Sequence, residues 1–182
     1  MSNFPLATLD TADEIAKPIL ENFKKNYGMI PNFFGALGID GTSLDAYLTF
    51  ENKITESTFL TNEQQELISL AVANQNGCHY CVSGHTFSAK KAGLSAKICL
   101  DAQKGINTDP KNQIILNIAL NILKNSGKLN EAILKDAAEH GITPEQVIQI
   151  AIFTALNTFS NWVNNIVDPT IDFPKVDLIS TP

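Results

Sequence analysis

The feature that most limits the fold of this 182-residue chain is a regular series of helix start signals, with almost no strand pattern between them. Polar residues that can cap a first helical turn mark the starts, and glycines mark several of the ends. We expect helices to begin at Thr11, Ser43, Thr61, Cys78, Ser95, Asp109, Asn130 and Thr143, with a short helical or irregular piece over residues 32–38. The sequence therefore predicts an all-α fold.

The first of these helices is expected to open with a capping box. Thr11 and Glu14 have the required spacing, so the helix would run from Thr11 to about Asn26 and end at Gly28. Pro18 lies inside this range and would bend the helix there.

Length and composition favour one ordinary globular domain over residues 1–182. Hydrophobic residues make up 44% of the chain and charged residues 18%, and no shift in composition divides it. From about Asp168 onward the chain contains three prolines, so we expect an extended C-terminal tail. Such a tail could wrap around a neighbouring subunit.

The net charge, the first ten residues and one long uncharged stretch limit the partners and the location that the sequence predicts. The net charge of −6 argues against a nucleic-acid-binding protein, which needs clustered Lys and Arg. The first ten residues, MSNFPLATLD, lack the basic start and apolar run of a signal peptide, which predicts a cytoplasmic protein. Residues 146–167 carry no charge over the length of a membrane span, but six Gln and Asn side chains among them favour a buried or oligomer-facing helix.

A weak internal repeat indicates that one helical motif is used twice. At an offset of 82 residues, the positions Thr61, Glu63, Gln64, Ile68 and Ala73 recur as Thr143, Glu145, Gln146, Ile150 and Ala155. The second copy has Ser160, Val163 and Val167 at the positions of Cys78, Cys81 and His85.

The residues most typical of a reaction centre lie between Glu66 and His85. Cys78 and Cys81 have C-x-x-C spacing directly after Gly77, which places both sulfurs in the first turn of a helix, where the cysteine pKa is lowered. His85 follows Cys81 by one turn, so its imidazole can accept the thiol proton. From position alone either sulfur is a candidate nucleophile, since Cys78 is nearer the helix start and Cys81 is nearer His85.

The same residue types also occur in zinc sites and as buried structural cysteines. Cys78, Cys81 and His85 are all zinc-ligand types, but a structural zinc site needs a fourth ligand and no second cysteine pair or histidine follows at the usual spacing. Cys99 has no partner cysteine nearby, so we expect a buried structural side chain. The sequence predicts no cofactor and no metal.

The same segment resembles the alkylhydroperoxidase D-like (AhpD-like) branch of the carboxymuconolactone decarboxylase superfamily. It has a glutamate, then Cys-x-x-Cys twelve residues later, then x-x-x-His, within the stretch NEQQELISLAVANQNGCHYCVSGHTFSAKKAGLS. The flanking stretches YGMIPNF and GITPEQVIQIAIFTALNTFSNWVNNI are similar to that family as well. The resemblance implies an all-α AhpD-like domain that assembles as a trimer or as a hexamer of three dimers.

In the family the second cysteine attacks peroxide, the first cysteine resolves the product, and a glutamate and histidine relay protons. Transferred to this chain, Cys81 attacks, Cys78 resolves, and Glu66 and His85 form the relay. The best-known family members have a histidine before the second cysteine, where this chain has Tyr80, a possible auxiliary residue. That difference is typical of a peroxidase-related subgroup.

Three functions follow as hypotheses. The first is a thiol-dependent peroxidase or disulfide reductase of antioxidant defence, an oxidoreductase acting on a hydroperoxide. The resemblance implies a thiol or lipoyl-type reductant as its electron donor, or a peroxiredoxin as its electron acceptor. The second is a decarboxylase acting on a lactone acid, and the third is a non-catalytic redox sensor.

Overall fold

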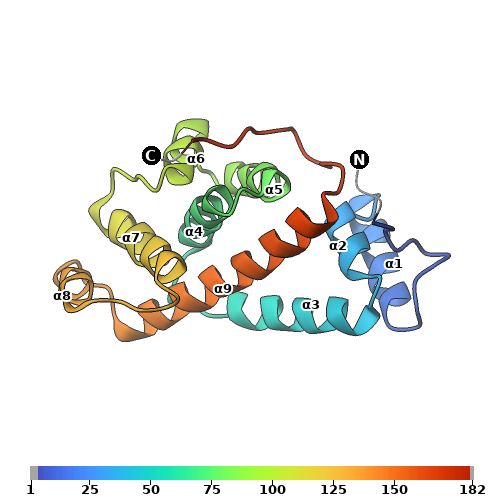
Figure 1. Ribbon diagram of the computed structural model, residues 1–182, viewed down its shortest axis with the longest axis horizontal. Coiled ribbons are helices and arrows are strands. Elements are labelled where there is room, and N and C mark those ends of the chain that lie inside the picture. Colours follow the sequence, from blue (N-terminus) through green and yellow to red (C-terminus); the bar gives the residue numbers. More distant parts are fainter. Residues whose placement is uncertain (1–3, 181–182) are drawn as a thin grey trace.

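The computed structural model describes residues 4–180. Residues 1–3 of the N-terminal segment and residues 181–182 of the predicted tail lie outside the described range. Over that range the chain is entirely helical apart from turns and extended connections, which confirms the all-α prediction (Figure 1). The helices are α1 (Ala16–Tyr27), α2 (Asn32–Leu37), α3 (Gly41–Thr55), α4 (Asn62–Gln75), α5 (His79–Lys91), α6 (Ala96–Gln103), α7 (Pro110–Lys124), α8 (Glu131–Glu139) and α9 (Pro144–Val167).

Helix α4 lies at the centre of the fold. Every residue from Leu67 to Asn74 is buried, so the helix has no solvent-facing side over two turns. It packs against α5, α6, α7 and α9, and a helix that is apolar all round is stable only when neighbours cover it in this way. The helix that carries Glu66 is therefore held rigidly from several sides.

The twice-used motif is confirmed at the starts of α4 and α9. In each helix a threonine hydroxyl accepts a hydrogen bond from the backbone N–H of a glutamine three residues later, and that glutamine side chain accepts from the threonine N–H. The pairs are Thr61 with Gln64 and Thr143 with Gln146. Beyond this start the copies differ, because α4 ends at Gln75 whereas α9 continues unbroken for 24 residues.

Helix α9 crosses the whole molecule, beneath α4 and α5 in Figure 1, and much of its amide-rich surface faces the interior. Gln146 Nε2 donates to the Phe59 carbonyl at 2.9 Å, and Gln149 Nε2 donates to the Ile54 carbonyl at 2.7 Å. These bonds satisfy the amides inside the protein. No helix within residues 4–180 combines the length and the apolar character needed to cross a membrane.

The predicted start of the first helix is wrong. Helix α1 begins at Ala16, whose N–H donates to Asp13 Oδ1 at 2.7 Å. The other oxygen of Asp13 accepts from Gly41 N at 2.9 Å at the start of α3, so one carboxylate serves two helix ends. This tertiary contact outweighs the local capping-box pattern of Thr11. Pro18 then lies in the first turn of α1, where a missing N–H costs nothing.

A second cap prediction is also wrong, because Asp40 and not Ser43 caps α3. The Asp40 side chain accepts from the backbone N–H of Thr42 at 3.2 Å, and the Ser43 hydroxyl donates to the same carboxylate. The N-cap therefore lies three residues earlier than predicted, and the helix begins at Gly41.

The described part of the C-terminal tail has no helix and runs back along its own α5 and α4 (Figure 1). Asn74 clamps it by donating to the Ile179 carbonyl at 3.0 Å and accepting from the Ile179 N–H at 2.8 Å. Val176 N donates to the Ser83 hydroxyl at 3.0 Å. The Phe173 ring covers α5 at Gly84, where a Cβ atom would approach that ring to 3.2 Å.

Candidate active site

The two cysteines lie at the turn between α4 and α5, in the positions expected from the sequence. Gly77 has a φ of +67°, a left-handed conformation that favours glycine and reverses the chain. Cys78 is then the N-cap of α5, and its sulfur accepts a hydrogen bond from Cys81 N at 3.1 Å. The Cα atoms are 5.3 Å apart and the two sulfurs form a disulfide. The structure is therefore that of the oxidised pair.

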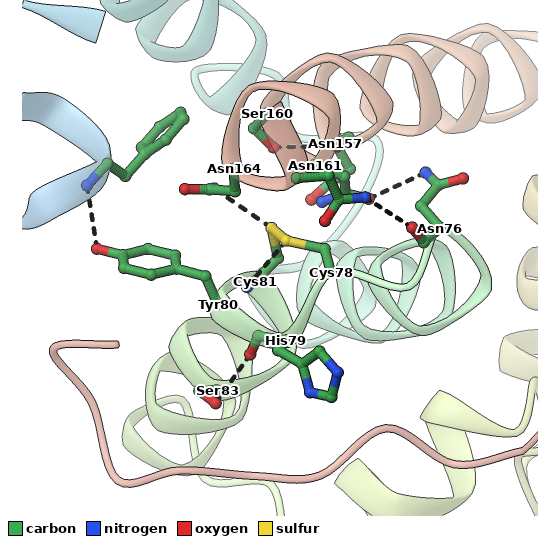
Figure 2. The surroundings of a disulfide bond; sticks show 12 residues. Asn76, Cys78, His79, Tyr80, Cys81, Ser83, Asn157, Ser160, Asn161 and Asn164 are labelled. Carbon is green, nitrogen blue, oxygen red and sulfur yellow. Dashed lines mark hydrogen bonds between the residues drawn. A yellow bond between two sulfur atoms is a disulfide. The ribbon is translucent and has the colours of Figure 1, made fainter. Parts of the chain in front are cut away.

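The disulfide is buried between α5 and the last turns of α9, as Figure 2 shows. Cys78 is 1% exposed and Cys81 is 5% exposed. Asn164 of α9 donates from Nδ2 to Cys81 Sγ at 3.4 Å. An N–H donor at this distance stabilises negative charge on the sulfur.

Buried amides of α9 surround the same point. Asn161 Oδ1 accepts from Asn76 Nδ2 at 3.0 Å (Figure 2). Asn165 Nδ2 donates to the Asn76 carbonyl at 2.9 Å, so both bonds hold α9 against the α4–α5 turn. The Asn164 side chain is buried, and its Oδ1 atom has no hydrogen-bond partner in the protein. A buried acceptor of this kind is costly unless something binds it.

Glu66 and His85 form a direct contact across the α4–α5 pair. Nδ1 of His85 lies 3.0 Å from Oε2 of Glu66, and the two side chains are 30% and 21% exposed. Burial lowers the pKa of His85, but the hydrogen bond and negative charge of Glu66 outweigh it, so the net shift is upward. The imidazole thus holds its proton more readily than a free histidine.

A second acidic group, Glu51 of α3, lies near this pair and was not predicted. Burial raises the pKa of the Glu51 carboxyl, while the Tyr47 hydrogen bond and the nearby His85 partly oppose the rise. The Tyr47 hydroxyl donates to Glu51 Oε1 at 3.2 Å. The site therefore contains two carboxyl groups around one histidine, with different surroundings.

The Tyr80 hydroxyl makes two hydrogen bonds, one to the tail and one to α2. The hydroxyl donates to Asp172 Oδ2 at 2.7 Å and accepts from Phe33 N at 3.2 Å, and the ring points toward α2 in Figure 2. Burial and the Asp172 hydrogen bond raise the pKa of the Tyr80 phenol far above its usual range. The phenol therefore stays protonated and links α2, α5 and the tail, and an auxiliary role in catalysis stays a prediction.

The remaining candidates lie apart from the disulfide. Cys99 is a free thiol buried in α6, and burial raises its pKa. His79 is exposed and its ring points away from the sulfurs in Figure 2. Among the described residues, no group of three or more His, Cys, Asp and Glu side chains is arranged to hold a metal ion.

One cavity adjoins the disulfide. It has a volume of about 190 Å³ and lies between the start of α5 and the end of α9. Its walls include Cys78, Tyr80, Asn164, Asp168 and Ile171. A small molecule in this space would meet the first cysteine of the pair.

Sequence reasoning missed Glu51 and Asn164, which reach the site from α3 and α9. Glu51 has the common appearance of a glutamate on a helix, and nothing local connects it to His85. Asn164 had a signal, because Asn157, Asn161 and Asn164 recur at helical spacing along one face. That pattern predicted burial but not the contact with sulfur.

Comparisons with known proteins agree with this arrangement. The model of the carboxymuconolactone decarboxylase family matches residues 42–102, which contain the glutamate and the cysteine pair. No curated protein matches the chain.

Several solved structures share the fold. The alkylhydroperoxidase AhpD core structure of an uncharacterized peroxidase-related protein from Ralstonia eutropha JMP134 is 26% identical with a TM-score of 0.77, and the match covers 97% of this chain and 93% of that chain. An uncharacterized peroxidase-related protein from Silicibacter sp. TM1040 is 20% identical with a TM-score of 0.78 and 91% of each chain covered. The debrominase Bmp8 is 20% identical with a TM-score of 0.74, covering 92% of this chain and 90% of its own. The family-model match over residues 42–102 and the shared fold, together with the glutamate and Cys-x-x-Cys motif, support the AhpD-like branch of the carboxymuconolactone decarboxylase superfamily for this chain.

Proposed function

We propose that this protein is a thiol-dependent peroxidase that reduces hydroperoxides through the Cys78–Cys81 pair. The observation that carries the proposal is a cysteine pair that forms a disulfide in a buried site, with a sulfur-directed N–H donor on one side. A histidine and carboxyl groups that can carry protons lie on the neighbouring helices. Thiol peroxidases need these two elements, a reversible disulfide and a source of protons.

The first step is attack by the Cys81 thiolate on the hydroperoxide. A bond forms between Cys81 Sγ and the terminal oxygen while the O–O bond breaks, and the alcohol leaves after taking up one proton. The product on the protein is a sulfenic acid. Asn164 stabilises the thiolate before attack, and the imidazolium of His85, held by Glu66, supplies the proton through water.

The second step closes the disulfide. Cys78 Sγ, as a thiolate, attacks Cys81 Sγ and displaces the hydroxyl group, which leaves as water with one proton. The peroxide has then gained two electrons and the cysteine pair has lost two. A thiol or lipoyl-type reductant must return them.

The test is steady-state hydroperoxide consumption with a dithiol as reductant. Wild type should turn over, whereas Cys78→Ser and Cys81→Ser should lose turnover. Cys99→Ala is the matched control, because Cys99 is a free buried thiol outside the pair, and its turnover should equal that of wild type. Turnover that survives both serine substitutions would contradict the proposal, and lactone decarboxylation surviving them would favour the lyase.

We further propose that the protein self-associates, as the trimer or hexamer of the family, and acts in the cytoplasm. Helix α9 carries exposed apolar side chains, namely Ile148, Phe159, Trp162 and Ile166. Trp162 is 60% exposed and is the single tryptophan of the chain, and large exposed aromatic groups are typical of subunit contacts. Light scattering should give a mass well above 19.8 kDa, and Trp162→Glu should lower it.

A further inference from the structure

We propose that the cavity between α5 and α9 is the entry port for a small dithiol reductant, which attacks Cys78 and releases Cys81 as a thiolate. This inference rests on the proposed function and assigns the reducing half of the cycle to a specific sulfur and a specific opening. Its basis is the position of the cavity, the surroundings of the two sulfurs and one unsatisfied polar atom.

The cavity selects Cys78 by access. Cys78 is among the residues that line its volume of about 190 Å³, and Cys81 is not. Both residues are otherwise buried, with 1% of Cys78 and 5% of Cys81 exposed, so it is the cavity lining and not overall exposure that separates them. Because thiol–disulfide exchange requires the attacking thiolate to reach one sulfur directly, access decides which sulfur is attacked.

The leaving group favours the same direction. Attack on Cys78 forces the electron pair of the broken S–S bond onto Cys81, and Asn164 Nδ2 already donates to that sulfur at 3.4 Å. Exchange is faster when the departing thiolate is the more stable one. Attack on Cys81 would instead expel Cys78. The reaction in the proposed direction restores the thiolate that meets the next peroxide.

An unsatisfied acceptor in the cavity wall offers a contact for the incoming molecule. Asn164 lines the cavity, and its buried Oδ1 atom has no partner in the protein. In Figure 2 this oxygen points away from the disulfide, on the side of Tyr80, which also lines the cavity. The second thiol of a dithiol bound there can donate its S–H to Asn164.

Reduction of the Cys78–Cys81 disulfide by a dithiol takes two thiol–disulfide exchange steps. One thiolate of the reductant bonds to Cys78 Sγ while the S–S bond breaks, which leaves Cys81 as a thiolate and a mixed disulfide on Cys78. The second thiol, after losing its proton, attacks the reductant's own sulfur, so the reductant closes into a disulfide and Cys78 leaves as a thiolate. The reductant loses two electrons and the protein pair gains them.

The first experiment identifies the attacked sulfur without any peroxide. Protein oxidised with diamide is mixed with excess 2-mercaptoethanol, quenched in acid within the first turnover, alkylated at low pH and digested. Fragment masses separate the two positions, because His79 and Tyr80 lie between the cysteines. We expect mercaptoethanol on Cys78 and the alkyl group on Cys81. The reverse pattern would overturn the proposal.

The second experiment blocks the opening. Ile171 lines the cavity from the tail, so Ile171→Trp should fill it and slow reduction of the oxidised protein by dithiothreitol at least about tenfold, while Ile171→Ala should not slow it. Leu178→Trp and Leu178→Ala are matched controls, since Leu178 is a partly buried tail residue away from the cavity walls. An unchanged rate in Ile171→Trp would refute the port. Neither measurement uses peroxide, so failure of the peroxidase proposal would leave both results interpretable.

Discussion

His85 Nδ1 lies 3.0 Å from Glu66 Oε2, and this contact joins the cysteine helix α5 to the central helix α4. Glu66 lies on a helix that is packed on several sides, so its carboxylate has a fixed position. A side-chain hydrogen bond with Asn157 of α9 adds to the effect of Glu66 and also raises the pKa of His85. The contact therefore fixes both the orientation and the charge of the histidine.

The charge of Glu66 should set the protonation of His85. The substitution Glu66→Gln removes this charge and should lower the pKa of His85. The main effect that raises the His85 pKa is then lost, while burial, which lowers that pKa, remains. An NMR titration of the histidine ring protons measures this shift. Glu63→Gln, which changes an exposed glutamate of the same helix, is the control and should leave the His85 signal as in wild type. An unchanged His85 titration would contradict the assigned contact.

Glu51 should make stability depend on pH. Its pKa is raised in the folded protein, so the folded state binds more protons than the unfolded state, and stability falls as the pH rises through that window. Glu51→Gln should therefore be more stable than wild type at pH 7, with the difference vanishing below about pH 4, near the usual glutamate pKa. Urea unfolding at several pH values measures this. The exposed control Glu21→Gln should follow wild type at every pH.

Asn164 should act on the Cys81 thiol. Asn164→Leu keeps a similar volume but removes the N–H donor, so the pKa of Cys81 should rise and its reaction with hydroperoxide at pH 7 should slow by about 5-fold to 100-fold, the loss of a charge-assisted hydrogen bond. The ultraviolet absorbance of the thiolate, followed against pH in a Cys78→Ser background, gives the pKa of Cys81. Asn165→Leu is the control, because Asn165 bonds to the backbone and not to sulfur. An equal pKa in both variants would contradict this role.

Tyr80 should matter for stability through the tail. Tyr80→Phe removes the hydrogen bond to the Asp172 carboxylate and the one accepted from Phe33 N, which should cost about 1–3 kcal/mol of unfolding free energy. Urea unfolding measures the loss, and amide hydrogen exchange should speed up in residues 172–179. A peroxide reaction as fast as in wild type would assign Tyr80 to structure alone. Unchanged stability would show that the two hydrogen bonds contribute nothing.

The parts predictable from sequence were those fixed by local interactions. The helix starts at Thr61 and Thr143, the turn at Gly77 and the cysteines at the start of α5 all depend on residues a few positions apart. The contact between Glu66 and His85 needed the family resemblance, because it joins two helices.

The errors and omissions arose from long-range contacts. Asp13 outcompetes Thr11 as a cap because it also accepts from Gly41, 28 positions along the chain. Asn164 meets Cys81 across 83 positions, and no spacing rule connects them. Such contacts depend on how α9 packs over the α4–α5 turn, which a helical pattern alone does not specify.

The most direct test of the account is a thiol count after reaction of the reduced protein with one equivalent of hydroperoxide. We predict that two of the three thiols are lost rapidly, that the Cys78–Cys81 disulfide forms, and that the Cys99 thiol is retained. In Cys78→Ser the reaction should stop at a sulfenic acid on Cys81, which dimedone traps. A sulfenic acid found on Cys78 instead, or three thiols remaining in wild type, would contradict it.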